Sequence, residues 1–199
     1  VRPAFSGSEA VLWAEQYEYD LVLLDLMLPG LTGEEFIAQM RRKKTMPILV
    51  LSAKAGLEDR VNVLRLGADD FISKPFDNAE VLARVEAQLR RYRQFSAPAE
   101  AGEVLRLGDL VLDREAVRVT AGGKDVALTA REFELLHTFL SSPGRVFTRE
   151  VLLAKLWGYD FFGDERVVDS HIKNLRHKLG IDCIETVRGV GYRAAKEAP

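Results

Sequence analysis

The apolar stretch at residues 19–30 constrains the fold more than any other segment. It reads YDLVLLDLMLPG, so an unbroken apolar run ends in Asp25 and is followed by a Pro29-Gly30 turn. Such a run is typical of a buried parallel strand, which delivers its last residue to the carboxyl edge of a sheet. In α/β proteins that edge holds the ligand sites. An aspartate there is more often a turn or helix-capping residue, so other segments must decide between the two roles.

Two later segments predict further polar side chains at the same edge. Residues 46–53 form a second apolar run that ends in Ser52, and residues 68–76 form a short third strand followed by Lys74 and Pro75. A carboxylate, a hydroxyl and an ammonium group are therefore expected together. They suit capture of a phosphoryl group by Asp25, with Ser52 and Lys74 stabilising charge on the phosphoryl oxygens. Phosphoryl transfer needs little more than a divalent cation.

These motifs resemble the receiver domain of two-component response regulators of the OmpR/PhoB family, and the resemblance extends over nearly the whole chain. It implies a flavodoxin-like, doubly wound α/β receiver in which Asp25 is phosphorylated. Ser52 and Phe71 match the switch residues of the family, and Lys74 matches a lysine that precedes a cis-proline. The resemblance also implies a Mg²⁺ ion bound by Asp25 and by the backbone carbonyl of Met27.

One departure from the family concerns the start of the chain. Family receivers open with a strand that ends in two acidic residues, and these hold most of the Mg²⁺. This chain starts too late to contain them, because residues 1–5 resemble the family's second strand and residues 6–10 the start of its second helix. About 30 residues, the usual length of a strand-helix unit, are expected to be missing. The expected receiver thus lacks its first strand and helix, and we expect the complete gene to encode the acidic pair.

Composition indicates a cytoplasmic protein with two small domains. The chain has 199 residues, of which 47% are hydrophobic, enough for two separate cores. The single Cys183 excludes an internal disulfide, and no apolar run is long enough for a membrane span or a signal peptide. Residues 1–103 carry 13 basic and 16 acidic side chains, and residues 104–199 carry 15 and 14. Neither half is basic enough to indicate nucleic acid by bulk charge alone.

A change of composition marks the boundary between the domains. The helical pattern of residues 78–93 gives way to small residues and proline, so we expect a receiver at 1–93, a flexible linker at 94–102 and a second domain at 103–197. The second domain begins with four short runs separated by turn residues. They predict a small antiparallel sheet from residues 104–107, 110–113, 116–120 and 125–128.

Three helices and a hairpin follow this sheet. Thr129 with Glu132 predicts a capping box at the start of the first helix, Thr148 caps the second, and the third runs from Asp164 to a stop at Gly180. The predicted core residues are Phe133, Leu135, Leu136, Phe139 and Leu140, then Val151, Leu152, Leu153, Leu156 and Trp157, then Val168, Ile172, Leu175 and Leu179. The alternating segment 184–193 has a Gly-Val-Gly tip. This order predicts an α+β winged helix-turn-helix domain that binds double-stranded DNA.

Between Arg166 and Gly180 the third helix carries four basic side chains against one acid, Asp169. A charge run on a helix is most often a solvated face, but its place before a predicted wing favours DNA recognition. The resemblance implies base or phosphate contacts by Arg166, Val167, Ser170, His171, Asn174 and Arg176 on the helix, and by Thr186 and Arg188 on the wing. The amide of Asn174 can pair with adenine, whereas an arginine there would favour guanine. His171 can equally be a surface histidine, and Asp169 is expected to be structural.

The resemblance implies two further surfaces. Three aromatic residues lie in the predicted loop 158–163, which in the family contacts RNA polymerase; the alternative is that they pack inward. Family members form homodimers on the face of the fourth helix, fifth strand and fifth helix of the receiver. The ion pairs expected across that interface are Arg60 with Glu80, Asp70 with Arg84, and Arg65 with Glu86.

The main functional hypothesis is a transcription regulator that a sensor histidine kinase switches on by phosphorylating Asp25. The homodimer would then bind repeated DNA half-sites. The alternative is a DNA-binding regulator that no longer uses phosphate, with a degenerate receiver that serves only dimerisation. An enzyme that forms an aspartyl-phosphate on a small metabolite would explain nothing after Gly102, so the sequence predicts no enzyme.

Overall fold

The computed structural model describes residues 1–53, 56–96, 103–158 and 165–196. The chain divides into two compact units, residues 1–94 and 95–199, and each is described by itself. The expected domain boundary at residue 93 lies one residue from this division. The helix before the boundary, however, runs to Ser96, three residues further than the sequence pattern predicts. No helix among the described residues is long and apolar enough to span a membrane.

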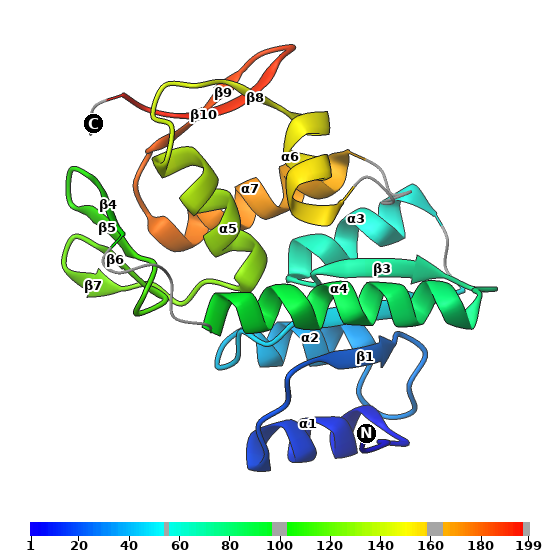
Figure 1. The fold of residues 1–199 in the computed structure, drawn as a ribbon. Helices are drawn as coiled ribbons and strands as arrows, with labels where there is room; N and C mark the ends of the chain where they lie inside the picture. The colour runs from blue at the N-terminus through cyan, green and yellow to red at the C-terminus, as the bar shows by residue number, and fades with distance from the viewer. Residues whose placement is uncertain (54–55, 97–102, 159–164, 197–199) are drawn as a thin grey trace. The chain divides into compact units, whose positions relative to one another are not determined.

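The first unit alternates helices and strands (Figure 1). Its elements are α1 (Gly7–Gln16), β1 (Val22–Asp25), α2 (Gly33–Met40), β2 (Ile48–Ser52), α3 (Leu57–Leu66), β3 (Asp70–Ser73) and α4 (Asn78–Ser96). The three strands form a parallel sheet in the order β1-β2-β3. All three predicted strands are confirmed, and the central strand is the most deeply buried because it has a neighbour on both sides.

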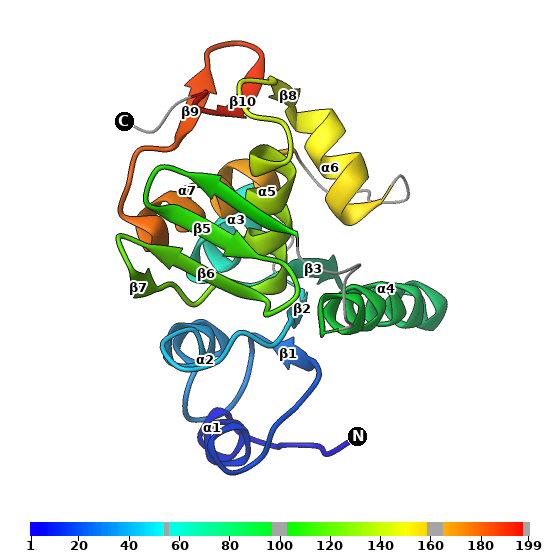
Figure 2. The same ribbon diagram turned by 60° about the vertical axis from the view of Figure 1, so that its left-hand side comes forward.

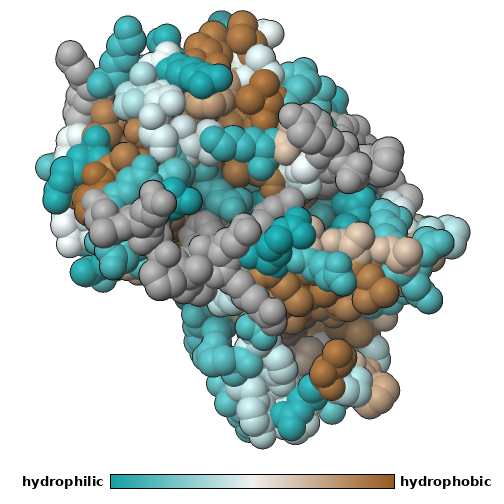
Figure 3. Space-filling view, viewed as in Figure 1, coloured by the Kyte–Doolittle hydropathy of each residue, from teal (hydrophilic) through white to brown (hydrophobic). Residues whose placement is uncertain are grey.

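The helices cover the two faces of this sheet unequally. Figure 2 shows α4 on one face, with α1 and α2 on the other, where α2 also packs against α1 and α3. Figure 3 shows apolar side chains gathered below α4. Among the large apolar residues of this unit, Leu23 of β1 and Leu82 of α4 are 47% and 61% exposed. The described residues therefore leave part of one sheet face uncovered.

The expectation that residues 1–5 form a strand is wrong. They are irregular, and the chain enters α1 through a cap in which Ser6 accepts a hydrogen bond from the backbone N–H of Glu9. In the expected sheet order the second strand pairs with the first, and no described residue supplies that first strand. Without a ladder partner the backbone of residues 1–5 gains nothing from an extended pairing conformation.

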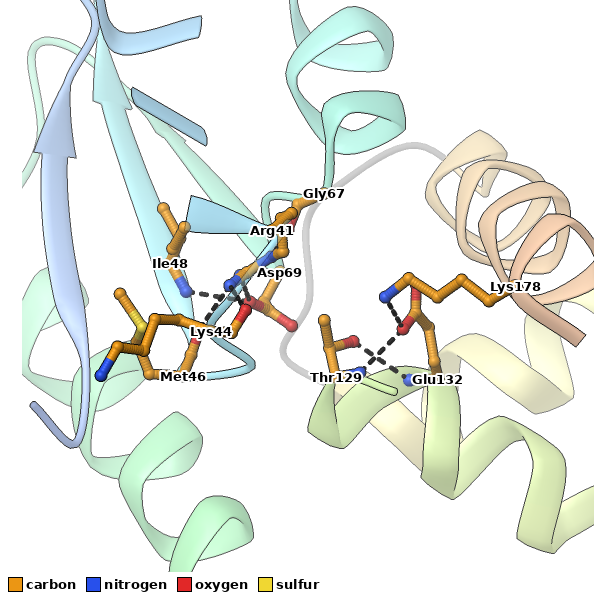
Figure 4. Close-up of polar contacts among 9 residues, drawn as sticks. All are labelled: Arg41, Lys44, Met46, Ile48, Gly67, Asp69, Thr129, Glu132 and Lys178. Atoms are coloured by element: carbon orange, nitrogen blue, oxygen red, sulfur yellow. Dashed lines mark hydrogen bonds and ion pairs between the residues drawn. The ribbon is translucent and has the colours of Figure 1, made fainter. Parts of the chain in front are cut away.

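A buried ion pair joins α2 to the start of β3. Arg41, just after α2, lies 2.7 Å from the carboxylate of Asp69, and their side chains are 8% and 1% exposed. Arg41 also donates to the carbonyl oxygens of Gly67 and Met46, while Asp69 accepts from the N–H of Ile48 at 2.9 Å (Figure 4). These bonds compensate the desolvation of both charges and fix the start of β2 beside the start of β3.

The second unit contains a four-stranded antiparallel sheet, three helices and a three-stranded sheet (Figure 2). Its elements are β4 (Val104–Leu107), β5 (Leu110–Asp113), β6 (Arg118–Ala121), β7 (Lys124–Asp125), α5 (Ala130–Leu140), β8 (Phe147–Thr148), α6 (Arg149–Trp157), α7 (Arg166–Leu179), β9 (Ile184–Val187) and β10 (Gly191–Ala194). The first sheet has the order β4-β5-β6-β7 and the second β8-β10-β9. The expected sheet, three helices and hairpin are all present.

The three helices pack on one another around a core that the sequence predicts almost completely. There are two exceptions in α6: Val151 lies in the first turn and is 46% exposed, and Leu153 is half-buried. Thr129 and Glu132 form the predicted capping box, and the buried carboxylate of Glu132 also binds Lys178 of α7 at 2.6 Å (Figure 4). The start of α5 is thereby tied to the end of α7, which Gly180 terminates with a φ of 65°.

The turn between β5 and β6 contains a strained residue. Val117 has a φ of 49° and is the one described non-glycine residue with a positive φ. A β-branched side chain fits this region poorly, because its Cβ substituents crowd the backbone. The antiparallel pairing of Asp113 with Arg118 closes the turn and holds Val117 in this conformation.

The buried pair gives a first prediction. Asp69→Ala is expected to lower the free energy of unfolding of the first unit by about 3 kcal/mol, because it leaves the Arg41 guanidinium buried without its carboxylate. Amide hydrogen exchange in β2 measures this free energy. Asp20→Ala is the control, since Asp20 is exposed, and it is expected to change stability by less than about 0.5 kcal/mol. Equal effects of the two substitutions would contradict the structural role of the pair.

The strained turn gives a second prediction. Val117→Asn is expected to raise the free energy of unfolding of the second unit by about 1 kcal/mol, because asparagine adopts a positive φ more readily. Amide hydrogen exchange in β5 and β6 checks it. Val117→Ala retains the penalty for a Cβ and is expected to give no comparable gain. If alanine stabilised the unit as much as asparagine, removal of the exposed valine side chain would explain the effect and backbone strain would not.

Candidate functional site

The carboxyl ends of the parallel strands bring the predicted acidic and basic groups together. Asp25 is the last residue of β1, Ser52 is the last of β2, and Lys74 follows β3 directly. The ammonium of Lys74 lies 2.5 Å from Oδ2 of Asp25, and the N–H of Met27 donates to Oδ1 at 3.0 Å. Lys74 is also followed by a cis peptide bond to Pro75, as the resemblance implies.

The surroundings of Asp25 favour its ionised form. Partial burial raises the pKa of this carboxyl group, but the hydrogen bonds from Lys74 and from the Met27 N–H outweigh burial, so its pKa lies below the usual value. The side chain is 34% exposed. An accessible carboxylate that is ionised at neutral pH can attack a phosphorus atom, and the adjacent ammonium can bind a phosphoryl oxygen.

The two predicted switch residues are both buried. Ser52 is fully buried at the end of β2, and Phe71 is 9% exposed in β3, with its N–H donating to Oδ1 of Asp70 at 2.8 Å. The sheet therefore places Ser52 at the edge that carries Asp25 and Lys74, and Phe71 within β3, three residues before Lys74. An inward Phe71 is one of the two states that a rotating aromatic residue would need.

The residues that the structure describes do not make a complete Mg²⁺ site. Mg²⁺ prefers six oxygen ligands in octahedral geometry. Asp25 and the carbonyl of Met27 offer one carboxylate and one carbonyl group, and no group of three His, Cys, Asp or Glu side chains among the described residues could hold a metal ion. Further ligands would be needed to hold the ion firmly.

One of the three ion pairs expected across a dimer interface forms within a single chain. Arg84 of α4 binds Asp70 of β3 at 3.2 Å and Glu80 of its own helix at 2.9 Å. Asp70 is only 4% exposed, so its carboxylate is buried within the fold of a single chain. Arg65 and Glu86 are exposed, and Arg60 is half-buried.

The recognition-helix candidate α7 exposes fewer of the predicted contact residues than expected. Arg166 is exposed and Asn174 is half-buried, but Val167, Ser170 and His171 are only 2–3% exposed. A contact with DNA requires an exposed side chain, so the prediction that these three residues are exposed is wrong. The ring of His171 lies 5.2 Å from that of Trp157, and the hydroxyl of Ser170 donates to the carbonyl of Arg166.

The wing is the β9–β10 hairpin, and its turn exposes Arg188. Thr186 is also exposed, but its hydroxyl accepts a hydrogen bond from Arg176 of α7 at 2.9 Å. Gly189 supplies the positive φ, 73°, that the turn requires. The wing and α7 are thus in direct contact through two of the residues predicted to bind DNA.

A second connection between α7 and the wing escaped the sequence analysis. Asp169 accepts hydrogen bonds from Arg149 and from the hydroxyl of Tyr192, both at 2.7 Å. The expected structural role of Asp169 is confirmed. Its partners lie 20 and 23 residues away, so no local periodicity indicates them.

The sequence analysis also assigned no role to Lys173, although this side chain is exposed on α7. The predicted aromatic loop falls at residues 159–163, outside the described residues.

Comparisons with known proteins agree with both halves of the chain. A family model for the response regulator receiver domain matches residues 1–86, and one for the C-terminal domain of transcriptional regulatory proteins matches residues 123–194. The transcriptional regulatory protein ResD of Bacillus subtilis (strain 168) is 45% identical over 199 residues, covering 96% of this chain and 83% of ResD.

Solved structures give the same result. Two mutants of RitR are each 32% identical, and each match covers 97% of this chain and 86% of the RitR chain, with TM-scores of 0.75 and 0.73. The families and the relatives are those of transcription regulators and not of enzymes. The chain therefore belongs to the two-component response regulators in which a receiver domain precedes a DNA-binding winged-helix domain of the OmpR/PhoB type.

Proposed function

We propose that phosphorylation of Asp25 by a sensor histidine kinase switches this regulator to a DNA-binding homodimer. The observation that supports it most is the contact between Asp25 and Lys74 at 2.5 Å, which leaves an accessible carboxylate beside an ammonium group. A phosphoryl group on Asp25 would bring new charged oxygens to this ion pair. Lys74 and the Ser52 hydroxyl would then rearrange around them, and Phe71 would follow.

The DNA interface that we propose combines α7 and the wing. Arg166 and Asn174 of α7 would read base edges or phosphates in the major groove, and Arg188 of the wing would contact the backbone or the minor groove. Lys173, exposed on the same helix, suits a phosphate contact. Two such modules in a dimer would bind repeated half-sites with added avidity.

The remaining partners are proposed from family membership. RNA polymerase would be the partner in activation, and the site of action would be the cytoplasm, where the DNA is. Mg²⁺ would be held partly by Asp25 and by the carbonyl of Met27. Because these two groups alone make a weak site, the phosphate-independent alternative also needs a test.

The phosphoryl site gives a third prediction. Incubation with acetyl phosphate and Mg²⁺ is expected to add one phosphoryl group to this protein, because the accessible carboxylate of Asp25 lies beside Lys74. Intact mass measures the addition. Asp25→Asn is expected to abolish it, whereas Asp20→Asn is a matched control that leaves it unchanged. If the protein remains unmodified while it binds DNA, the phosphate-independent function is the correct one.

The dimer face gives a fourth prediction. If Arg65 of one subunit pairs with Glu86 of the other, Arg65→Glu and Glu86→Arg should each weaken dimerisation of the phosphorylated protein about tenfold, since two attractive pairs become repulsive. Analytical ultracentrifugation measures the dimerisation constant. Mixing the two variants should restore dimers, because every pair in the mixed dimer joins opposite charges. A mixture that dimerises no better than its components would contradict pairing across the interface.

A further inference from the structure

Arg176 of α7 points at the wing and makes its hydrogen bonds there. Its Nε and Nη2 atoms donate to the carbonyl of Ile184 at 3.0 and 2.7 Å, and Nη2 also donates to the hydroxyl of Thr186 at 2.9 Å. Both acceptors belong to β9, and Ile184 is fully buried. A guanidinium group presents its donors in one rigid plane, so these bonds fix its orientation.

A second attachment lies two helical turns earlier on α7. Asp169 accepts from the hydroxyl of Tyr192 on β10, and Arg149 donates to both groups. Asp169 and Arg176 are seven residues apart, so they share one face of α7 and are separated by roughly 10 Å along its axis. The ring of Tyr192 connects the two attachments, because Arg176 lies 5.7 Å from its centre. The two attachments add to the pairing of β10 with β8 and fix the angle between the hairpin and α7.

Arg188 lies at the turn of this braced hairpin, two residues beyond Thr186. We propose that Arg176 is a positioning residue, which holds the wing at the angle to α7 at which Arg188 and the α7 contacts reach the same duplex. This assignment rests on the proposed binding of DNA. It replaces the expected base or phosphate contact of Arg176, because the Nε and Nη2 donors of its guanidinium are already engaged by β9. The hydroxyl of Thr186 acts in the same brace.

The test is a double-substitution cycle with Arg176→Ala and Arg188→Ala in the full chain. The probe is a fluorescent duplex selected from a random-sequence library by the unaltered protein, and its affinity is measured over a series of salt concentrations. Loss of the phosphate contact of Arg188 should reduce the slope of log K against log salt by about 1. Arg176→Ala should produce the same reduction, because it misplaces Arg188, and the double variant should lose little more than either single variant.

Lys173→Ala is the matched control on α7. It is exposed and should combine additively with Arg188→Ala. Arg176→Ala should also speed amide hydrogen exchange in β9, which Lys173→Ala should not do. If Arg176→Ala lowers the melting temperature of the second unit below the assay range, Thr186→Val replaces it in the same cycle, since it removes the hydroxyl and keeps the shape.

Additive losses for Arg176→Ala and Arg188→Ala, with a slope reduced by about 2 in the double variant, would assign Arg176 its own contact with DNA and overturn the proposal. Failure of the proposed function gives a different result. In that case the unaltered protein selects no duplex, and no cycle can be started.

Discussion

Parallel pairing of β1, β2 and β3 is the constraint on which the receiver site depends. Asp25 and Lys74 are 49 residues apart in sequence, yet the ladder places both at the carboxyl edge, where they are 2.5 Å apart. The buried pair of Arg41 and Asp69 holds the opposite ends of β2 and β3. One end of the sheet is therefore fixed by a buried ion pair, and the other presents an accessible one that chemistry can change.

A short chain of contacts connects β3 to the helix α4 beside it. Phe71 donates its N–H to Asp70, which pairs with Arg84, and Arg84 also binds Glu80. A change in the position of Phe71 would alter the surroundings of a carboxylate that is almost fully buried. These contacts give a physical route from β3 to α4, in which the pair of Arg84 with the more exposed Glu80 contributes only about 0–1 kcal/mol.

The sequence predicts most of the fold because its patterns are local. Apolar runs identify the three strands, and Thr129, Glu132 and Gly180 mark the ends of helices. It fails where burial depends on distant partners. His171 is buried beside Trp157, which lies on α6, and nothing in the pattern of α7 indicates that contact.

The same limit explains the outcome for the candidate sites. Asp25, Ser52 and Lys74 each come at the end of an apolar run, so the geometry of parallel sheets predicts from the sequence that they lie close together. Arg176 resembles an exposed basic residue in sequence, and its bonds to Ile184 and Thr186 emerge only when the hairpin folds back on α7. A basic residue of α7 can therefore bind the wing without any local pattern that distinguishes it from an exposed one.

The central claim is that a phosphoryl group on Asp25 controls DNA binding, and DNA affinity before and after phosphorylation tests it most directly. The protein treated with acetyl phosphate and Mg²⁺ is predicted to bind a selected duplex with two half-sites at least about tenfold more tightly than the untreated protein. The Asp25→Asn variant is predicted to show no change. Equal affinities of the treated and untreated proteins, once intact mass has verified the modification, would contradict the account.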